Sequence, residues 1–337
     1  MSQLRYDPST DSWVVIATER GKRPHDFKIA PLERRGGECP FCYGNEDQTP
    51  PEVYASGREV DVPNSPGWTV RVVPNLFPAL SLEAQAREEV VPPLYREMPG
   101  IGVHEVFIES PHHDSTFGSH SKGQLKSIIK ALLQRYYTLR SNPQLKYLQF
   151  FKNSGRVAGA SLEHAHCQII ATPMVPVTVA HKLTIAKRYF EEHRHCLYCA
   201  MVETEPAGPR LVAKNEHFLV FCPFASRFPY EMWILPRRHN HDFGLLADEE
   251  IEPLCEILSM GFRRLETAFE VIPYNMVLHT TPFEPGHEYY HWHLEILPRL
   301  TIIAGFELGS GYYINPTAPE LAAESLRQVE EEIVTYS

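Results

Sequence analysis

Long apolar runs are missing from this sequence of 337 residues, and so is an apolar segment behind the first methionine. A membrane-spanning helix needs roughly 18 consecutive apolar residues, and no stretch approaches that length. Residues 1–13 are polar, whereas a secretion signal carries an apolar stretch followed by small residues. These absences argue against a protein held by membrane helices, and we expect a cytoplasmic location.

A positive net charge is also missing. Lys and Arg number 32 against 42 Asp and Glu, which gives a formal net charge of −10. This argues against a general nucleic-acid-binding protein, which usually carries a basic face. A single nucleotide is not excluded, because one phosphate group needs only a few local cations. The basic loop Arg20-Gly21-Lys22-Arg23-Pro24 is the exception, and charge alone favours a solvated turn there.

Cysteine is scarce, with seven residues in the chain. An odd number without a secretion signal argues against a disulfide framework. Four of the seven nevertheless form two Cys-x-x-Cys pairs, Cys39/Cys42 and Cys196/Cys199. Such a pair can be a metal site, a redox dithiol or merely two buried cysteines, so its companions must decide.

The two halves of the chain repeat each other. Residues 104–108 correspond to 230–234 at an offset of 126, and residues 147–151 correspond to 274–278 at an offset of 127. Between these strand-like segments, apolar residues recur at helical spacing in both halves. We therefore predict an α+β fold of two repeated modules, 1–176 and 177–337, each with an antiparallel sheet and flanking helices.

Further elements follow from local signals. Helical spacing predicts main helices over 125–136 and 251–265, a connecting helix over 178–195 and a final helix over 320–332. Pro253 predicts that the second main helix begins nearby, since proline is favoured in a first helical turn. Glycines in residues 306–312 predict a tight loop before the final helix.

Histidines accompany the cysteine pairs at matching positions. His113 and His239 precede a His-x-His run by 51 and 52 residues, respectively. Two cysteines and two histidines supply a closed tetrahedral zinc site with no open position for water. We therefore predict two mainly structural zinc ions per chain, held by Cys39, Cys42, His113 and His164 and by Cys196, Cys199, His239 and His291. The neighbouring histidines that could replace an assigned one are His112, His195 and His241.

Residues 153–168 carry the densest chemistry. In an extended strand His164, His166 and Gln168 point to the same side. Small residues ahead of them, such as Gly159, let backbone N–H groups approach a phosphate closely. An imidazole beside such a loop predicts a histidine that attacks phosphorus. In the second half His293 mirrors His166 without a comparable loop, so we expect His293 to pack or hydrogen-bond near the metal.

Together these residues resemble the galactose-1-phosphate uridylyltransferases and their relatives in the histidine-triad superfamily, over most of the chain. The matching elements are Arg20-x-x-Arg23-Pro24, Cys39/Cys42, Asn75, Ser110-Pro111-His112-His113, residues 153–168, His279, His291-x-His293 and Gly305-Phe306-Glu307. The resemblance implies two histidine-triad-like modules, with His166 as the nucleophile and His164 as a zinc ligand.

The resemblance also implies the residues that surround the substrate. Those expected to contact the phosphates are Asn153, Gly159, Ser161 and Gln168, and those expected near the nucleotide or phosphate are Arg20, Arg23 and Asn75. A homodimer is implied, in which the C-terminal loop with Phe306 and Glu307 completes the site of the other subunit.

Two features depart from the familiar family pattern. Ala165 stands where the family's His-Pro-His has proline. Better-known members also place a Glu and three His around iron in the second half, where this chain offers Cys196 and Cys199. The second cysteine pair looks more like the branch that includes plant ADP-glucose phosphorylase.

The resemblance implies a UDP-glucose:galactose-1-phosphate uridylyltransferase that works through a covalent uridylyl-histidine. ADP-glucose phosphorylase, which would transfer an adenylyl group to phosphate through His166, is the alternative. A zinc-stapled nucleotide-binding protein without catalysis is a third hypothesis. Gln168 favours transfer over hydrolysis, because an amide has no proton to exchange. The expected partners are a UDP- or ADP-sugar and a sugar 1-phosphate or phosphate, with no nucleic acid or membrane.

Overall fold

A computed structural model describes residues 2–20, 27, 38–60, 62–83, 89–91, 94–269 and 272–335. The strands are β1 (Gln3–Asp7), β2 (Ser12–Ile16), β3 (Tyr54–Ser56), β4 (Val70–Pro74), β5 (Glu89–Val91), β6 (Tyr95–Glu97), β7 (Val103–Ile108), β8 (Tyr147–Ser154), β9 (His166–Thr172), β10 (Leu211–Lys214), β11 (Phe218–Phe221), β12 (Met232–Pro236), β13 (Tyr274–His279), β14 (His293–Pro298) and β15 (Tyr313–Asn315). The helices are α1 (Lys122–Arg140), α2 (Val177–His193), α3 (Leu197–Thr204), α4 (Asp248–Phe269), α5 (Gly305–Ser310) and α6 (Pro319–Thr335). Short 3-10 turns are η1 (Thr18–Arg20), η3 (Glu46–Gln48), η4 (Arg156–Ala158), η5 (Glu205–Ala207) and η6 (Phe243–Leu245).

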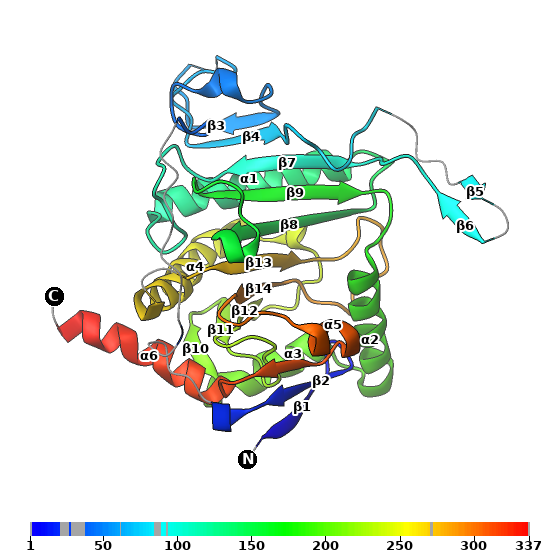
Figure 1. The fold of residues 1–337 in the computed structure, drawn as a ribbon, viewed down its shortest axis with the longest axis vertical. Coiled ribbons are helices and arrows are strands. Elements are labelled where there is room, and N and C mark those ends of the chain that lie inside the picture. The colour runs from blue at the N-terminus through cyan, green and yellow to red at the C-terminus, as the bar shows by residue number, and fades with distance from the viewer. Residues whose placement is uncertain are drawn as a thin grey trace.

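One ten-stranded sheet, in the order β10-β11-β12-β14-β13-β8-β9-β7-β4-β3, runs through both halves of the chain (Figure 1). Its neighbouring strands pair antiparallel. The halves meet where β8 pairs with β13, with Asn153 opposite Asn275. The predicted α+β fold with antiparallel sheets is therefore confirmed, and the sheets of the two halves are joined edge to edge.

Helices α1 and α4 pack against each other and cover one face of this sheet (Figure 1). Apolar side chains at helical spacing, such as Leu125 and Ile129 on α1 and Leu254 on α4, are buried there against strand residues such as Phe150. Both predicted main helices are thus confirmed. The start predicted near Pro253 is wrong, because α4 begins at residue 248, where acidic side chains in its first turn favour the helix N-terminus.

The other face, which we call the site face, carries the predicted nucleophile. Residues directly opposite each other in an antiparallel pair project to the same side, and side chains alternate along each strand. Gln168 lies opposite Phe151, and Asn153, two residues further along β8, lies opposite Asn275. Therefore His166, Gln168, Asn153 and Asn275 all belong to the site face.

A second, three-stranded sheet has the order β1-β2-β15, and β2 and β15 pair in parallel. The first strands of the chain therefore pair with a strand near its end. The boundary between residues 176 and 177 stays a prediction. The connecting helix is confirmed as α2, which ends where Arg194 takes a left-handed φ of 52°.

The C-terminal region departs from its prediction at one point. The final helix is confirmed as α6, but the tight loop expected over residues 306–312 is wrong in part, since Gly305–Ser310 form the short helix α5. The Glu307 carboxylate accepts a hydrogen bond from the Ala304 N–H at 3.0 Å, which caps the helix start. Gly311, at φ 74°, ends it. Among the described residues, no helix combines the length and the apolar character needed to cross a membrane.

Candidate active site and metal centres

A glycine-rich loop leads from β8 to β9 along the site face. Gly155 has φ 82° and Gly159 has φ 93°, which are backbone angles that residues other than glycine rarely adopt. A Cβ at Gly155 would lie 2.9 Å from the Cβ of Pro273, so the close approach of the second half also requires glycine there. The loop therefore holds a bent backbone close to the first residue of β9.

His166, the first residue of β9, is only 6% exposed. Its Nδ1 lies 2.8 Å from the carbonyl oxygen of His164. Since a carbonyl can only accept, Nδ1 carries the hydrogen and Nε2 keeps the free electron pair. Burial, followed by the ammonium of Lys152, lowers the pKa of His166 below its usual value. The imidazole is therefore neutral near pH 7, which is the form that can act as a nucleophile.

Gln168 and Asn75 meet at a residue that the sequence analysis did not select. His104 Nε2 lies 2.8 Å from Gln168 Oε1 and 3.2 Å from Asn75 Nδ2. The backbone N–H of Ala79 donates to Nδ1 of His104 at 3.2 Å. In the sequence, His104 is the first residue of the strand-like segment 104–108. Only the pairing of β7 with β9 shows that this segment lies beside the strand of His166.

The structure also brings Asn153 and Gly159 together. A Cβ at Gly159 would lie 3.6 Å from Asn153 Nδ2, and Oδ1 of Asn153 accepts from Asn275 at 2.8 Å. Ser161 is exposed on the loop just before β9. The predicted phosphate contacts Asn153, Gly159, Ser161 and Gln168 thus lie on one loop and two adjacent strands next to His166.

The side chain of Arg20 and the whole of Arg23 lie outside the described residues. Phe306 and Glu307 belong to α5, which contacts β15 and lies away from β9 (Figure 1). Within one chain they therefore take no part in the described site, and their contribution from a second subunit stays a prediction.

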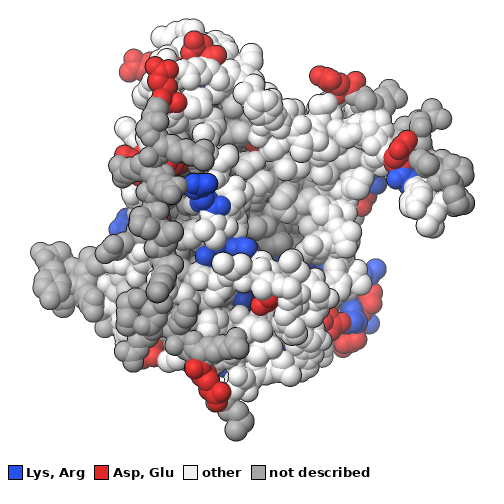
Figure 2. Space-filling model, in the orientation of Figure 1, with Lys and Arg blue, Asp and Glu red and all other residues white. Residues whose placement is uncertain are grey.

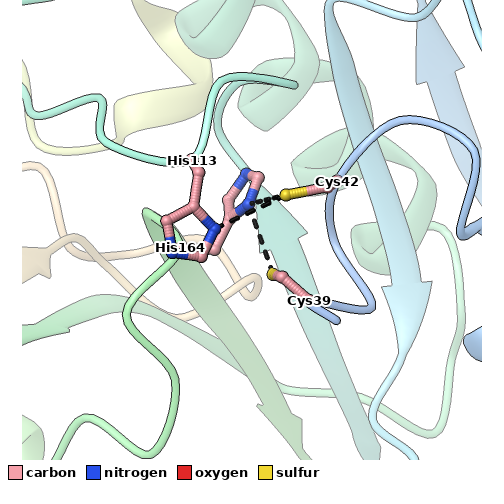
Figure 3. Close-up of side chains that lie close together, drawn as sticks. All are labelled: Cys39, Cys42, His113 and His164. Atoms are coloured by element: carbon pink, nitrogen blue, oxygen red, sulfur yellow. Dashed lines mark hydrogen bonds between the residues drawn. The ribbon is translucent and has the colours of Figure 1, made fainter. Parts of the chain in front are cut away.

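The first predicted metal group is assembled from three separate loops (Figure 3). The Sγ of Cys42 lies 3.4 Å from Nδ1 of His113 and 3.5 Å from Nδ1 of His164, and the Sγ of Cys39 lies 3.5 Å from the latter nitrogen. A tetrahedral zinc ion, with Zn–S near 2.3 Å and Zn–N near 2.0 Å, separates its S and N ligands by about 3.5 Å. The four side chains therefore fit zinc.

Outer hydrogen bonds orient these ligands. Nε2 of His164 lies 2.7 Å from the carbonyl oxygen of Ser110, so it donates its hydrogen there and Nδ1 is left to face the thiols. Burial is the main reason why the pKa of His164 falls to about 4. The neutral ring, with its free electron pair on Nδ1, is the form that binds metal.

The second predicted group repeats this arrangement. The Sγ of Cys199 lies 3.2 Å from Nδ1 of His239 and 3.6 Å from Nδ1 of His291, and Cys196 completes the group. Nε2 of His291 lies 2.9 Å from the carbonyl oxygen of Pro236. The chain thus offers two Cys₂His₂ groups of similar arrangement, and the role of the eight residues as ligands stays a prediction.

The second half holds a third group of possible ligands on the site face, formed by His279, His293 and Glu295. The ammonium of Lys182, from α2, forms an ion pair with Glu295 and lies 3.5 Å from Nε2 of both histidines. Nδ1 of His293 lies 3.1 Å from the carbonyl oxygen of His291, as His166 does from that of His164. His293 therefore packs near the metal group, as expected, and a cation from the chain itself fills this cluster.

Figure 2 shows that acidic side chains on the drawn face lie mainly toward its rim, while its middle carries uncharged side chains and a few cations. An acidic protein with a formal charge of −10 thus keeps this part of its surface free of a dense negative patch. An anionic ligand meets less repulsion there.

The sequence matches known protein families and individual proteins over most of its length. Residues 1–176 match the family described as galactose-1-phosphate uridyl transferase, N-terminal domain, and residues 116–333 match a domain of unknown function. ADP-glucose phosphorylase of Arabidopsis thaliana is 36% identical over 336 residues, covering 97% of this chain and 93% of that protein. Galactose-1-phosphate uridylyltransferase of Thermotoga maritima is 30% identical over 342 residues, covering 99% of this chain and 100% of that one.

Solved structures give the same result. The crystal structure of the Arabidopsis ADP-glucose phosphorylase with bound ADP-glucose superposes with a TM-score of 0.82 at 33% identity, covering 97% of this chain and 99% of that one. A uridylyltransferase structure superposes with a TM-score of 0.77 at 30% identity, covering 99% and 100%. This chain, with its histidine and glycine-rich loop, is therefore an enzyme of the nucleotidyltransferase type and belongs to the galactose-1-phosphate uridylyltransferase family.

Proposed function

We propose that this enzyme moves a nucleotidyl group from a nucleoside-diphosphate sugar to a phosphate-bearing acceptor through His166. The observation that carries the proposal is the hydrogen bond from Nδ1 of His166 to the carbonyl oxygen of His164, at 2.8 Å. It fixes the tautomer whose Nε2 has a free electron pair beside the glycine-rich loop. A catalytic histidine that does covalent chemistry needs such an orienting partner.

In the first step Nε2 of His166 attacks the α-phosphorus. A phosphorus–nitrogen bond forms while the bond from that phosphorus to the bridging oxygen breaks, and the sugar 1-phosphate leaves with the electron pair. The hydrogen on Nδ1 stays on the ring, held by the carbonyl of His164. The positive charge that develops on the imidazole is thereby stabilised, and the nucleotidyl-histidine remains on the enzyme.

In the second step a phosphate oxygen of the acceptor attacks the same phosphorus. The bond from phosphorus to Nε2 of His166 breaks, and the imidazole regains its free electron pair. Amide donors from Gln168 and Asn153, with backbone N–H groups of the loop, are suited to the charge on the phosphoryl oxygens. A sugar 1-phosphate leaves as a stabilised anion and needs no strong acid. The absence of a need for an acid agrees with Gln168, which lies two residues after the proposed nucleophile and has no ionisable group.

Two donors are candidates. UDP-glucose, with galactose 1-phosphate as acceptor, is the reaction that the family resemblance implies. ADP-glucose, with phosphate as acceptor, is favoured by the higher identity to the Arabidopsis ADP-glucose phosphorylase, 36% against 30% for the Thermotoga uridylyltransferase. The chemistry at His166 is the same in both reactions, so the base and the acceptor alone separate them.

We further propose zinc in both Cys₂His₂ groups, hence two ions per chain, and a homodimer in which α5 of one subunit approaches the site of the other. The S to N distances of 3.2 to 3.6 Å support zinc. When bound, each ion cross-links segments that are distant in the sequence. In the first group this link includes His164, whose carbonyl orients His166.

The test is intact-protein mass spectrometry after brief incubation with UDP-glucose or, separately, ADP-glucose. A UMP adduct that disappears on adding galactose 1-phosphate would identify the uridylyltransferase, and an AMP adduct that disappears on adding phosphate would identify the phosphorylase. His166→Ala must form neither, whereas the control His193→Ala, at the exposed end of α2, must form the same adduct as the wild type. Zinc-replete wild-type protein without an adduct would overturn the proposal.

A further inference from the structure

We propose that Asn275, which belongs to the second half of the chain, is a positioning residue for the phosphate site of the first half. It holds the amide of Asn153 with its nitrogen turned toward the glycine-rich loop. This inference deepens the nucleotidyl transfer proposed above and rests on it.

The contact occurs where the two halves share their sheet. Asn275 on β13 lies directly opposite Asn153 on β8, so both side chains project from the site face. Nδ2 of Asn275 lies 2.8 Å from Oδ1 of Asn153 and 2.8 Å from the carbonyl oxygen of Ala158. Both distances are those of ordinary hydrogen bonds.

The backbone carbonyl fixes which amide atom is which. The oxygen and nitrogen of an amide side chain are assigned from their hydrogen-bond partners. The carbonyl of Ala158 can only accept, so the atom of Asn275 that faces it must be the nitrogen. This nitrogen has a second hydrogen, and the atom of Asn153 that receives it must therefore be the oxygen. The nitrogen of Asn153 is left on the side of Gly159, where an added Cβ would lie 3.6 Å from it.

The same contact holds the loop itself. Ala158 is the last residue of η4, and the carbonyls at such an end lack partners within the turn. Asn275 supplies one, while Pro273, two residues earlier, approaches Gly155 so closely that a Cβ there would lie 2.9 Å away. The beginning of β13 therefore fixes both ends of the turn. A donor that is already aimed at the phosphoryl oxygens needs no rearrangement when charge develops.

The experiment measures the rate of adduct formation on His166 by rapid quench, at saturating UDP-glucose or ADP-glucose, whichever labels the wild type. We expect Asn275→Ala to slow this step by about 10- to 100-fold, which is less than the roughly 100- to 1,000-fold found when a donor to a transition-state oxyanion is itself removed, because Asn153 keeps its amide. Asn275→Asp keeps the shape but loses the donor, so it should be equally slow. In an Asn153→Ala background, Asn275→Ala should slow the step by less than about threefold more, since only the contact with the Ala158 carbonyl is then left to lose.

The matched control is Gln149→Ala. Gln149 also bridges the two halves from β8, since its Nε2 donates to the carbonyl of Leu278 at 2.7 Å, but it has no contact with Asn153 among the described hydrogen bonds. This variant should form the adduct at the wild-type rate. Zinc content and the midpoint of urea unfolding are measured for every variant.

Three outcomes would overturn the assignment. The first is a wild-type adduct rate in Asn275→Ala. The second is a result that indicates a general structural role. Either the fold reductions of Asn275→Ala and Asn153→Ala multiply fully in the double variant, or both the Ala and the Asp variant of Asn275 lose the folded state. Both leave the proposed function intact as long as the wild type forms its adduct. Absence of the adduct in the wild type is the third, and it would overturn the proposed function together with this inference.

Discussion

The ammonium group of Lys182 lies 3.5 Å from Nε2 of His293. His293 corresponds in the repeat to His166, whose Nε2 is the proposed nucleophile. The second half thus keeps the His-x-His pattern and the hydrogen bond from Nδ1 to the preceding histidine's carbonyl. In place of a loop for phosphate, however, it presents a lysine from the connecting helix. One copy of the repeat places a glycine-rich loop before its histidine, and the other places the ammonium of a lysine beside it.

This cation should contribute to stability. Lys182→Met leaves Glu295 buried with Arg227 as its remaining cationic partner, and we expect a loss of about 3 kcal/mol in the free energy of unfolding, because removing one partner of a buried ion pair is costly. Urea unfolding measures it. Lys187→Met, on the same helix but exposed and 4.0 Å from Glu191, should change the value by less than about 0.5 kcal/mol. Equal midpoints for the two variants would contradict the role of Lys182.

Metal content should depend on the first cysteine pair. We expect Cys42→Ser to lose one zinc ion per chain by elemental analysis. The adduct on His166 should also form more slowly, because the carbonyl that orients His166 belongs to the ligand His164. Cys255→Ser replaces a buried cysteine of α4 outside both groups and should keep the wild-type metal content. Undiminished zinc in Cys42→Ser would refute this ligand set.

Stability should fall in acid through Glu52. Burial alone would raise the pKa of this carboxyl, but hydrogen bonds from Arg58 and Arg71 outweigh it and lower the pKa to about 2. Since an unfolded Glu has a pKa of about 4.3, the contribution is fully present above that pH and is lost as the pH falls toward 2. Between about pH 5 and about pH 2.5, the wild type should lose about 2 kcal/mol more than Glu52→Gln does. If the unfolding free energies of the wild type and Glu52→Gln fall in parallel with pH, the ion pairs of Glu52 with Arg58 and Arg71 contribute nothing.

The loop glycine should be irreplaceable for two separable reasons. Gly155→Ala introduces a side chain at φ 82° and brings its Cβ within 2.9 Å of Pro273, so we expect a loss of more than about 2 kcal/mol in unfolding free energy and slower adduct formation. Gly44→Ala has a similar φ of 87° with nothing within 4 Å, so it should show the backbone strain alone, about 1 kcal/mol. If both variants lose the same amount, the close approach to Pro273 has no energetic weight.

Much of the site could be predicted because it depends on local patterns. The alternation of His164, His166 and Gln168 already indicates a strand with one reactive face. The repeat extends this to the second half, because a pattern found twice assigns His239 and His291 to the second cysteine pair. The helices followed from apolar spacing, whereas α5 was missed because one capping carboxylate, Glu307, outweighed the glycines around it.

The sequence by itself therefore determined the repeat, the strand that begins with His166 and the two Cys₂His₂ groups, all of which follow from spacing and repetition along the chain. Only the tertiary structure decided which side chains support them. Lys182, His104 and Asn275 act through partners 111, 64 and 122 residues away, respectively. No local pattern encodes such contacts, because they arise from the pairing of β7 with β9, the pairing of β8 with β13 and the packing of α2, and these depend on how the whole chain folds.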